Sequence, residues 1–229
     1  MKKYIVLAVL FILPIVVYMF FASGVNNFGK LPTLTTEQVQ DVTAFTNPNP
    51  KAVSFKGKIS VLGFLGEDVN SKKLNAFNLN QKIYKRFNGF KDFQFVFLLP
   101  FGTEQAADSL KKELSPLADV SNWHFLFDSK ENIETVFNSL QTPFTLSDTG
   151  YSPYVFIIDK DEKLRGRVKD DDTKRELYGY DATSVAVLNN KMIDDIKVLL
   201  AEYRLALKKN GKSKDRDSYL KYNKNSDEK

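Results

Sequence analysis

Short apolar runs that alternate with amphipathic stretches limit the fold of this chain more than any other feature. After residue 50, apolar runs lie at 58–65, 93–99, 123–127 and 154–158. Runs of this length, rich in branched and aromatic residues and bounded by turn residues, favour buried strands. Strands that alternate with helices predict an α/β domain in which helices flank a mixed sheet.

Amphipathic stretches between these runs predict helices at 71–87, 103–114 and from 129 to Leu140, with a closing helix at 189–207. In the first helix we assign the apolar side to five residues: Leu74, Phe77, Ile83, Tyr84 and Phe87. Residues 164–168 are expected to pair with the fourth strand as a hairpin. Residues 42–45 are a short strand candidate, and 171–187 have no assigned element.

The amino-terminal segment 4–23 carries no charged residue. Twenty helical residues span about 30 Å, the thickness of a bilayer core. Because Lys2 and Lys3 precede it, we predict a signal anchor with a cytoplasmic stub at 1–3. The body would lie on the periplasmic side of the inner membrane. The alternative is a signal peptide that is cleaved near Ala22.

Charge is concentrated at the carboxyl terminus. The net charge is +5, and segment 208–229 holds eight Lys/Arg against four Asp/Glu. The remaining chain is nearly balanced, so a nucleic-acid-binding body is not expected. We predict a linker at 24–50, a folded domain at 51–207 and a charged, disordered tail at 208–229. The tail has two interpretations. One is contact with anionic lipid headgroups or with an acidic partner. The other is solubilisation alone.

The chain has no cysteine and a single histidine, His124. It therefore has no disulfide, no thiolate metal site and no cysteine nucleophile. One histidine leaves no ordinary histidine-based metal site within a single chain. We expect no cofactor, no bound metal and no identifiable small-molecule substrate.

Two motifs carry a resemblance to a known family. Phe55-Lys56-Gly57-Lys58 precedes an apolar strand that ends in Phe64, and 151–159 reads as a strand followed by an aspartate turn. Together with the closing helix they resemble the Sco/SenC branch of the thioredoxin-like fold over 51–207. Proteins of this branch are membrane-anchored factors that help to assemble the copper centre of cytochrome c oxidase. The resemblance also implies a cis-proline at Pro153.

The chain departs from that family at its functional positions. The two family cysteines correspond to Glu67 and Ser71, and no histidine stands near Ser152, just before the fourth strand. Carboxylate and hydroxyl groups cannot replace two thiolates for Cu(I) or for disulfide exchange. We therefore expect a redox-inactive protein that is not an enzyme. It would be an accessory or scaffold with a protein partner in respiratory-complex assembly, and the candidate partner face comprises Glu67, Ser71, Ser152 and Pro153.

Two other functions remain open from the sequence. The first is an enzyme with non-thiol chemistry at Glu67 and Asp68, which requires further acidic residues that converge on this pair. The second is a copper carrier that uses His124 and methionines. Besides His124 it would have Met1, Met19 and Met192, of which two belong to the amino-terminal segment.

Overall fold

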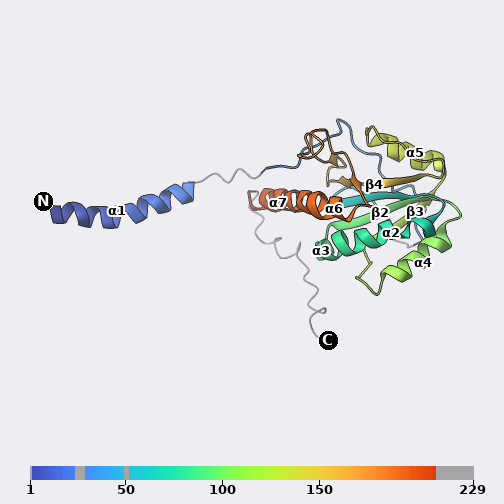
Figure 1. Ribbon diagram of the computed structural model, residues 1–229, viewed down its shortest axis with the longest axis horizontal. Helices are drawn as coiled ribbons and strands as arrows, with labels where there is room; N and C mark the ends of the chain where they lie inside the picture. Colours follow the sequence, from blue (N-terminus) through green and yellow to red (C-terminus); the bar gives the residue numbers. More distant parts are fainter. Residues whose placement is uncertain (1, 24–28, 49–51, 210–229) are drawn as a thin grey trace.

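The computed structural model describes residues 2–23, 29–48 and 52–209 (Figure 1). Helix α1 (Lys2–Ser23) has 22 residues and precedes the body. Among the residues whose side chains the structure describes, no helix is both long enough and apolar enough to cross a membrane. Of the predicted linker and tail, 24–28, 49–50 and 210–229 lie outside the described residues.

A mixed sheet forms the centre of the body, with strand order β3-β2-β1-β4-β5. Strands β1 (Ile59–Leu65), β2 (Phe93–Pro100) and β3 (Trp123–Asp128) are parallel. Strand β4 (Tyr151–Ile158) runs antiparallel to β1, and β5 (Leu164–Arg165) and β6 (Tyr180–Asp181) both pair with β4. This order, with helices on both faces, is the thioredoxin-like fold, so the prediction of an α/β domain with a mixed sheet is confirmed.

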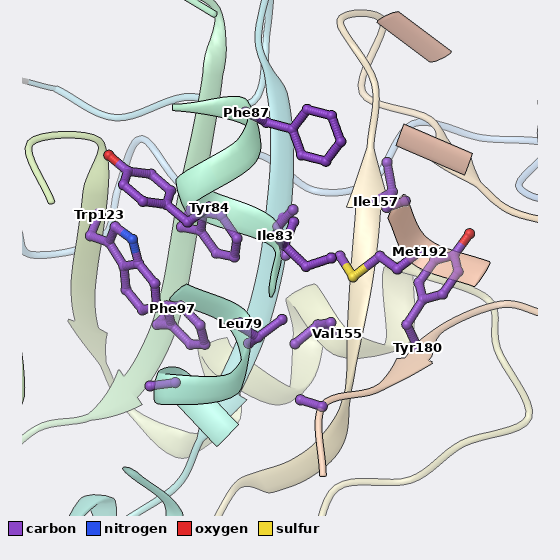
Figure 2. Packing of buried hydrophobic residues seen from close by; sticks show 14 of the residues in the cluster. Leu79, Ile83, Tyr84, Phe87, Phe97, Trp123, Val155, Ile157, Tyr180 and Met192 are labelled. Carbon is purple, nitrogen blue, oxygen red and sulfur yellow. The ribbon is translucent and has the colours of Figure 1, made fainter. Parts of the chain in front are cut away.

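Three helical segments cover one face of the sheet. They are α2 (Val69–Leu79) with η1 (Asn80–Tyr84) and α3 (Lys85–Phe87); α4 (Glu104–Leu114); and α6 (Val185–Val187) with η2 (Leu188–Met192) and α7 (Ile193–Lys209). Their apolar sides pack on the odd-numbered residues of β1, β2 and β3. Figure 2 shows Tyr84, Trp123 and Phe97 grouped together, with Met192 beside Ile157 and Val155. Trp123 stacks on Phe97 with ring centroids 5.1 Å apart.

Helix α5 (Lys130–Ser139) and segment 29–48 cover the opposite face. Phe64 and Phe137 meet edge to face with ring centroids 5.1 Å apart, which joins β1 to α5. Val39, Val42 and Phe45 of the segment are buried against the same cluster. Both faces of the sheet are therefore buried from solvent, which explains why the strands are continuously apolar.

Segment 29–48, expected to belong to a linker, is part of the body. It forms a bridge with β5, Thr33 to Arg165, and another with β3, Thr46 to Phe127. We call it the strap, because it crosses one face and reaches both edge strands of the sheet. The folded domain thus begins before the predicted boundary at residue 51. The strand expected at 42–45 is instead a turn, closed by a 3.0 Å hydrogen bond from Phe45 N to the Val42 carbonyl.

Other differences from the sequence expectations are local. Strand β4 begins at Tyr151 rather than at residue 154, and β6 lies inside the unassigned stretch 171–187. Leu74, expected on the buried side of its helix, is 66% exposed. Ile83, Tyr84 and Phe87 are buried as expected. The buried side of the helix also includes Val69, Ala76 and Leu79, together with Asn75 and Asn80.

Candidate functional site

The chain turns sharply from β1 into α2 in the loop that contains Gly66 and Glu67. Gly66 has φ +68°, and a Cβ there would lie 2.8 Å from the Thr149 carbonyl, so a side chain would be strained. Asp68 caps α2, because its Oδ1 accepts a 3.2 Å hydrogen bond from the Ser71 N–H. Hydrogen bonds from Ser71 lower the pKa of Asp68.

Glu67 and Ser71, two residues of the predicted partner face, are both exposed. Glu67 forms a 2.7 Å ion pair with Lys130, the first residue of α5. Its backbone N–H donates to the Thr149 carbonyl at 3.0 Å. The Ser71 hydroxyl donates to the Asp68 carbonyl at 3.2 Å. Both side chains therefore help to hold the turn in place.

Ser152 and Pro153 lie in β4, beside the end of β1. Ser152 pairs with Phe64, is 4% exposed, and accepts a 3.1 Å hydrogen bond from Tyr154 N–H through its hydroxyl. The described residues contain no cis peptide bond, so Pro153 is trans and the cis-proline expectation is wrong. The Pro153 carbonyl accepts from Ala182 N–H at 2.9 Å, which ties β4 to the loop after β6.

Tyr151 lies between these two parts of the site. Its hydroxyl accepts a 2.8 Å hydrogen bond from the Asn75 side chain, and the Lys72 ammonium lies 4.8 Å from the centre of its ring. Partial burial raises the pKa of Tyr151. The tyrosine thus connects β4 to the first turns of α2 through its side chain.

An exposed aromatic residue completes this edge of the sheet. Phe101 follows β2, is 55% exposed, and its N–H donates to the Asp128 carbonyl at 3.1 Å. The ends of β1, β2 and β3 thus meet along one border because the strands are parallel. We call this border the α2 edge, with surface residues Glu67, Asp68, Ser71, Phe101, Lys130 and Tyr151. Of the predicted face, Glu67 and Ser71 are accessible on it, whereas Ser152 is buried beneath.

Sequence reasoning missed Lys130 and Phe101. Phe101 lies two residues after the predicted strand 93–99, and Lys130 lies three residues after the predicted strand 123–127. Because the carboxyl ends of neighbouring parallel strands lie at the same border of a sheet, this position places both residues at the border where the strand 58–65 ends. No apolar periodicity marks them, because they stand in loops or at the first position of a helix.

The two carboxylates at this edge have separate structural roles. Glu67 pairs with Lys130, and Asp68 caps α2. Within the described residues, no group of three or more His, Asp or Glu side chains is arranged to hold a metal ion. The convergence of acids that an enzyme at Glu67 and Asp68 requires is therefore not seen in this part of the chain.

His124 and Met192 do not converge either. His124 is half-buried on β3, and its neighbours Trp123 and Phe125 belong to the cluster under α2 and α7. Because side chains alternate along a strand, His124 points to the other face. Met192 is fully buried within the first cluster, so the sheet separates these two side chains.

No protein-family model and no curated protein matches this chain. Solved thioredoxin-like structures are similar to it, and they include two Sco proteins. The thioredoxin domain of a thiol-disulfide oxidoreductase from Bacteroides vulgatus has 18% identity and a TM-score of 0.43, with 72% of this chain and 99% of that chain covered.

The soluble domain of Sco1 from Bacillus subtilis has 18% identity and a TM-score of 0.43, with 73% and 94% covered. ScoI from Bradyrhizobium japonicum, solved with copper bound, has 16% identity and a TM-score of 0.40, with 72% and 98% covered. At these identities the similarity concerns the fold alone.

Proposed function

We propose that the protein is a non-catalytic, thioredoxin-like binding protein that recognises a protein partner through the α2 edge. The supporting observation is the exposed Phe101 ring, which lies on the border where Glu67 and Ser71 replace two thiols. The chain has no cysteine, so thiol–disulfide exchange through its own residues is excluded. The fold then contributes a surface in place of a nucleophile.

The composition of the α2 edge suits protein recognition. Phe101 is 55% exposed and Leu74, one turn of α2 beyond Ser71, is 66% exposed. Exposed aromatic and aliphatic side chains beside charged groups are typical anchors of interfaces. The turn that carries Glu67 is fixed by Gly66 and by the Lys130 ion pair, so a partner would meet a preformed surface.

We further propose that the protein is anchored in the inner membrane by segment 4–23, with its body on the periplasmic side. The support is the uncharged sequence of that segment and the two lysines before it. Retention of the full chain in membranes after alkaline carbonate washing tests the anchor. Release of the protein by that wash would remove it from the proposal.

The partner we propose is a component of a respiratory complex, or of the machinery that assembles one. This part of the proposal derives from the resemblance of 51–207 to Sco/SenC proteins. Deletion of the gene should lower the amount of assembled cytochrome c oxidase, measured by haem spectra of membranes. Normal oxidase in the deletion strain would refute the assembly role.

Complementation of that deletion strain tests the α2 edge itself. Phe101→Asp should fail to restore the oxidase, because loss of an interface anchor weakens binding by about thirtyfold or more. Lys112→Asp is the matched control, since Lys112 is an exposed residue near the far end of α4. Equal rescue by both variants would argue against the α2 edge as the binding surface. Circular dichroism would verify that both variants are folded.

A further inference from the structure

The end of the body opposite the α2 edge brings several chain segments together. Gly57 N–H donates to the Lys160 carbonyl at 2.9 Å, and Ile59 N–H donates to the Asp92 carbonyl at 2.8 Å. Lys160 N–H donates to the Tyr203 hydroxyl at 3.3 Å. The starts of β1 and β2, the end of β4 and the last turns of α7 therefore meet here. Since β1 has seven residues, this end lies about 23 Å from the α2 edge.

Basic side chains gather at this end, which we call the basal end. They are Lys56 and Lys58 before β1, Lys85 and Arg86 in α3, Lys91 before β2, and Arg204 in α7. Five of these six are exposed, and Lys58 is 37% exposed. Figure 1 shows α3 and the end of α7 on the same side of the body, with α2 extending toward the other side.

The acidic residues at the basal end leave an excess of positive charge. Asp92 pairs with Lys58 at 3.4 Å and with Lys160 at 2.7 Å. Asp159 and Glu202 are both paired with the buried Arg165. The β4–β5 hairpin adds the carboxylates of Asp161 and Glu162, and the strap adds those of Glu37 and Asp41. These four groups reduce the excess of positive charge at the basal end but do not cancel it. The α2 edge, by contrast, presents Glu67 and Asp68 beside Lys130.

Both described ends of the body lie at the basal end. The Leu31 carbonyl accepts from Arg165 Nε at 2.9 Å, and Arg165 also binds Glu202 of α7. The chain that follows α1 therefore reaches the body here. Five residues, 24–28, separate α1 from Gly29 and span at most about 18 Å. Helix α7 ends here as well, and the sequence that follows it is basic.

We propose that the basal end docks on a bilayer surface that carries anionic headgroups, which directs the α2 edge away from the membrane. This inference rests on the proposed anchoring of α1. A short tether holds the basic side chains within reach of the headgroups, where each one strengthens attachment about fivefold. Salt weakens such attachment, because the headgroup potential decays over a Debye length.

The absence of cysteine makes a direct test simple, because one introduced cysteine is the sole labelling site. The full chain is reconstituted in vesicles of phosphatidylcholine, alone or mixed with phosphatidylglycerol. A fluorophore is attached at Asn88→Cys, between Arg86 and Lys91, or at Gln105→Cys, in the first turn of α4 at the α2 edge. Nitroxide-headgroup lipid quenches whichever probe lies near the membrane surface.

The Asn88 probe should be quenched several-fold more in the mixed vesicles than in phosphatidylcholine, and high salt should abolish the difference. The Gln105 probe should show little quenching in either. Reversal of Lys56, Arg86 and Lys91 to glutamate should remove the effect. Reversal of Lys72, Lys73 and Lys130, an equal change of net charge at the α2 edge, should leave it intact.

The inference would be overturned if quenching of the Asn88 probe were equal in the two kinds of vesicle. It would also be overturned if quenching were unchanged after reversal of Lys56, Arg86 and Lys91. Equal quenching of the Gln105 probe would overturn it too, because the body would then have no fixed orientation. Carbonate washing of the same vesicles separates the two proposals. A protein that is washed off lacks the anchor. If such a protein still binds anionic vesicles at neutral pH in a salt-sensitive way, docking through the basal end is supported. If it does not bind them, docking through the basal end is refuted.

Discussion

Asn80 is a polar side chain within an apolar layer. It opens η1, has 0% exposure, and neither its amide nitrogen nor its amide oxygen has a hydrogen-bond partner in the described part of the chain. A buried amide without partners costs free energy, because the groups lose their hydrogen bonds to water and gain none. A leucine at this position would fill a similar volume without that penalty.

Asn80→Leu should therefore raise the free energy of unfolding by about 1 kcal/mol. Urea unfolding followed by tryptophan fluorescence measures this, since Trp123 lies in the same core cluster as the neighbouring Leu79 and Ile83. Asn78→Leu is the matched control. Asn78 donates to the Ala182 carbonyl at 3.1 Å, so its loss should lower stability by a similar amount. Destabilisation by Asn80→Leu would show that this amide has a role that the contacts do not reveal.

Asp170 is a buried carboxylate whose Oδ2 accepts hydrogen bonds from Lys191 and Thr173, whereas its Oδ1 has no hydrogen-bond partner in the described part of the chain. Burial by itself would raise the pKa of Asp170, but hydrogen bonds from Lys191 and Thr173 outweigh it and lower the pKa to about 2. Lys191 Nζ lies 2.7 Å from Asp170 Oδ2. Because the folded pKa is below the unfolded value of about 3.9, the carboxylate stabilises the fold fully above pH 4.

The stability contributed by Asp170 should be lost as pH falls from about 4 to about 2. Asp170→Asn should cost about 2 kcal/mol at neutral pH, since it removes hydrogen bonds to a charged group. It should also weaken the acid dependence in that window. Thermal melts at a series of pH values measure both effects. An unchanged acid profile in the variant would assign the acid sensitivity to other carboxylates.

At the scale of elements, Arg165 links three separate parts of the chain. Its guanidinium contacts the Leu31 carbonyl of the strap, Asp159 at the start of the β4–β5 turn, and Glu202 of α7. Asp159 is 2% exposed; its Oδ2 accepts from Arg165 at 2.8 Å, and its Oδ1 accepts from the Asp161 and Lys163 N–H groups. The ion-pair network raises the pKa of Arg165 despite its burial.

Arg165→Met should lower the free energy of unfolding by about 3–5 kcal/mol, because it leaves a buried carboxylate unpaired. It should also increase hydrogen exchange in 29–34, measured by mass spectrometry. Arg167→Met removes the neighbouring pair with Asp195 and should not affect exchange in the strap. Unchanged exchange in 29–34 after the Arg165 change would show that the backbone bridge alone holds the strap.

The helix that begins at the α2 edge shows what a sequence can and cannot predict. Its existence followed from the amphipathic pattern, but it begins at Val69 and is capped by Asp68, whereas the sequence predicted a start at residue 71. Its buried side was predicted only in part. Ile83, Tyr84 and Phe87 are buried as expected, but Asn75 and Asn80 also occupy core positions and Leu74 is exposed. Asn75 is buried because it binds Tyr151, a residue far along the chain. Such long-range pairing leaves no periodic signal.

The strands, by contrast, were predictable because burial on both faces makes them continuously apolar. The exceptions were short pairings such as β6, which two residues form against β4. The strap was mistaken for a linker because its apolar residues are spaced irregularly among Asn, Thr and Pro. The α2 edge was located by resemblance, whereas Phe101 and Lys130 required the parallel-strand rule.

At the scale of the whole molecule, the strap decides where the domain can be cut. Val39, Val42 and Phe45 of the strap are buried, and Thr46 pairs with the edge strand β3. A fragment that starts at residue 51 would lose roughly 5 kcal/mol of apolar burial. It would also expose two sheet edges, which invite strand pairing between copies.

The fragment 51–229 should therefore aggregate, while 29–229 should remain monodisperse. Light scattering at matched concentrations distinguishes the two. Monodisperse behaviour of the shorter fragment would mean that the strap contributes little to the stability of the body.

Attachment of the strap through Leu31 has a mechanical consequence. A pull on the chain before Gly29 would reach the body at the Arg165 side chain, which binds both the sheet and α7. The force would act on the sheet and on α7 together, and would not detach the strap from one end. Tension between the anchor and a partner bound at the α2 edge would therefore be borne by the sheet and α7.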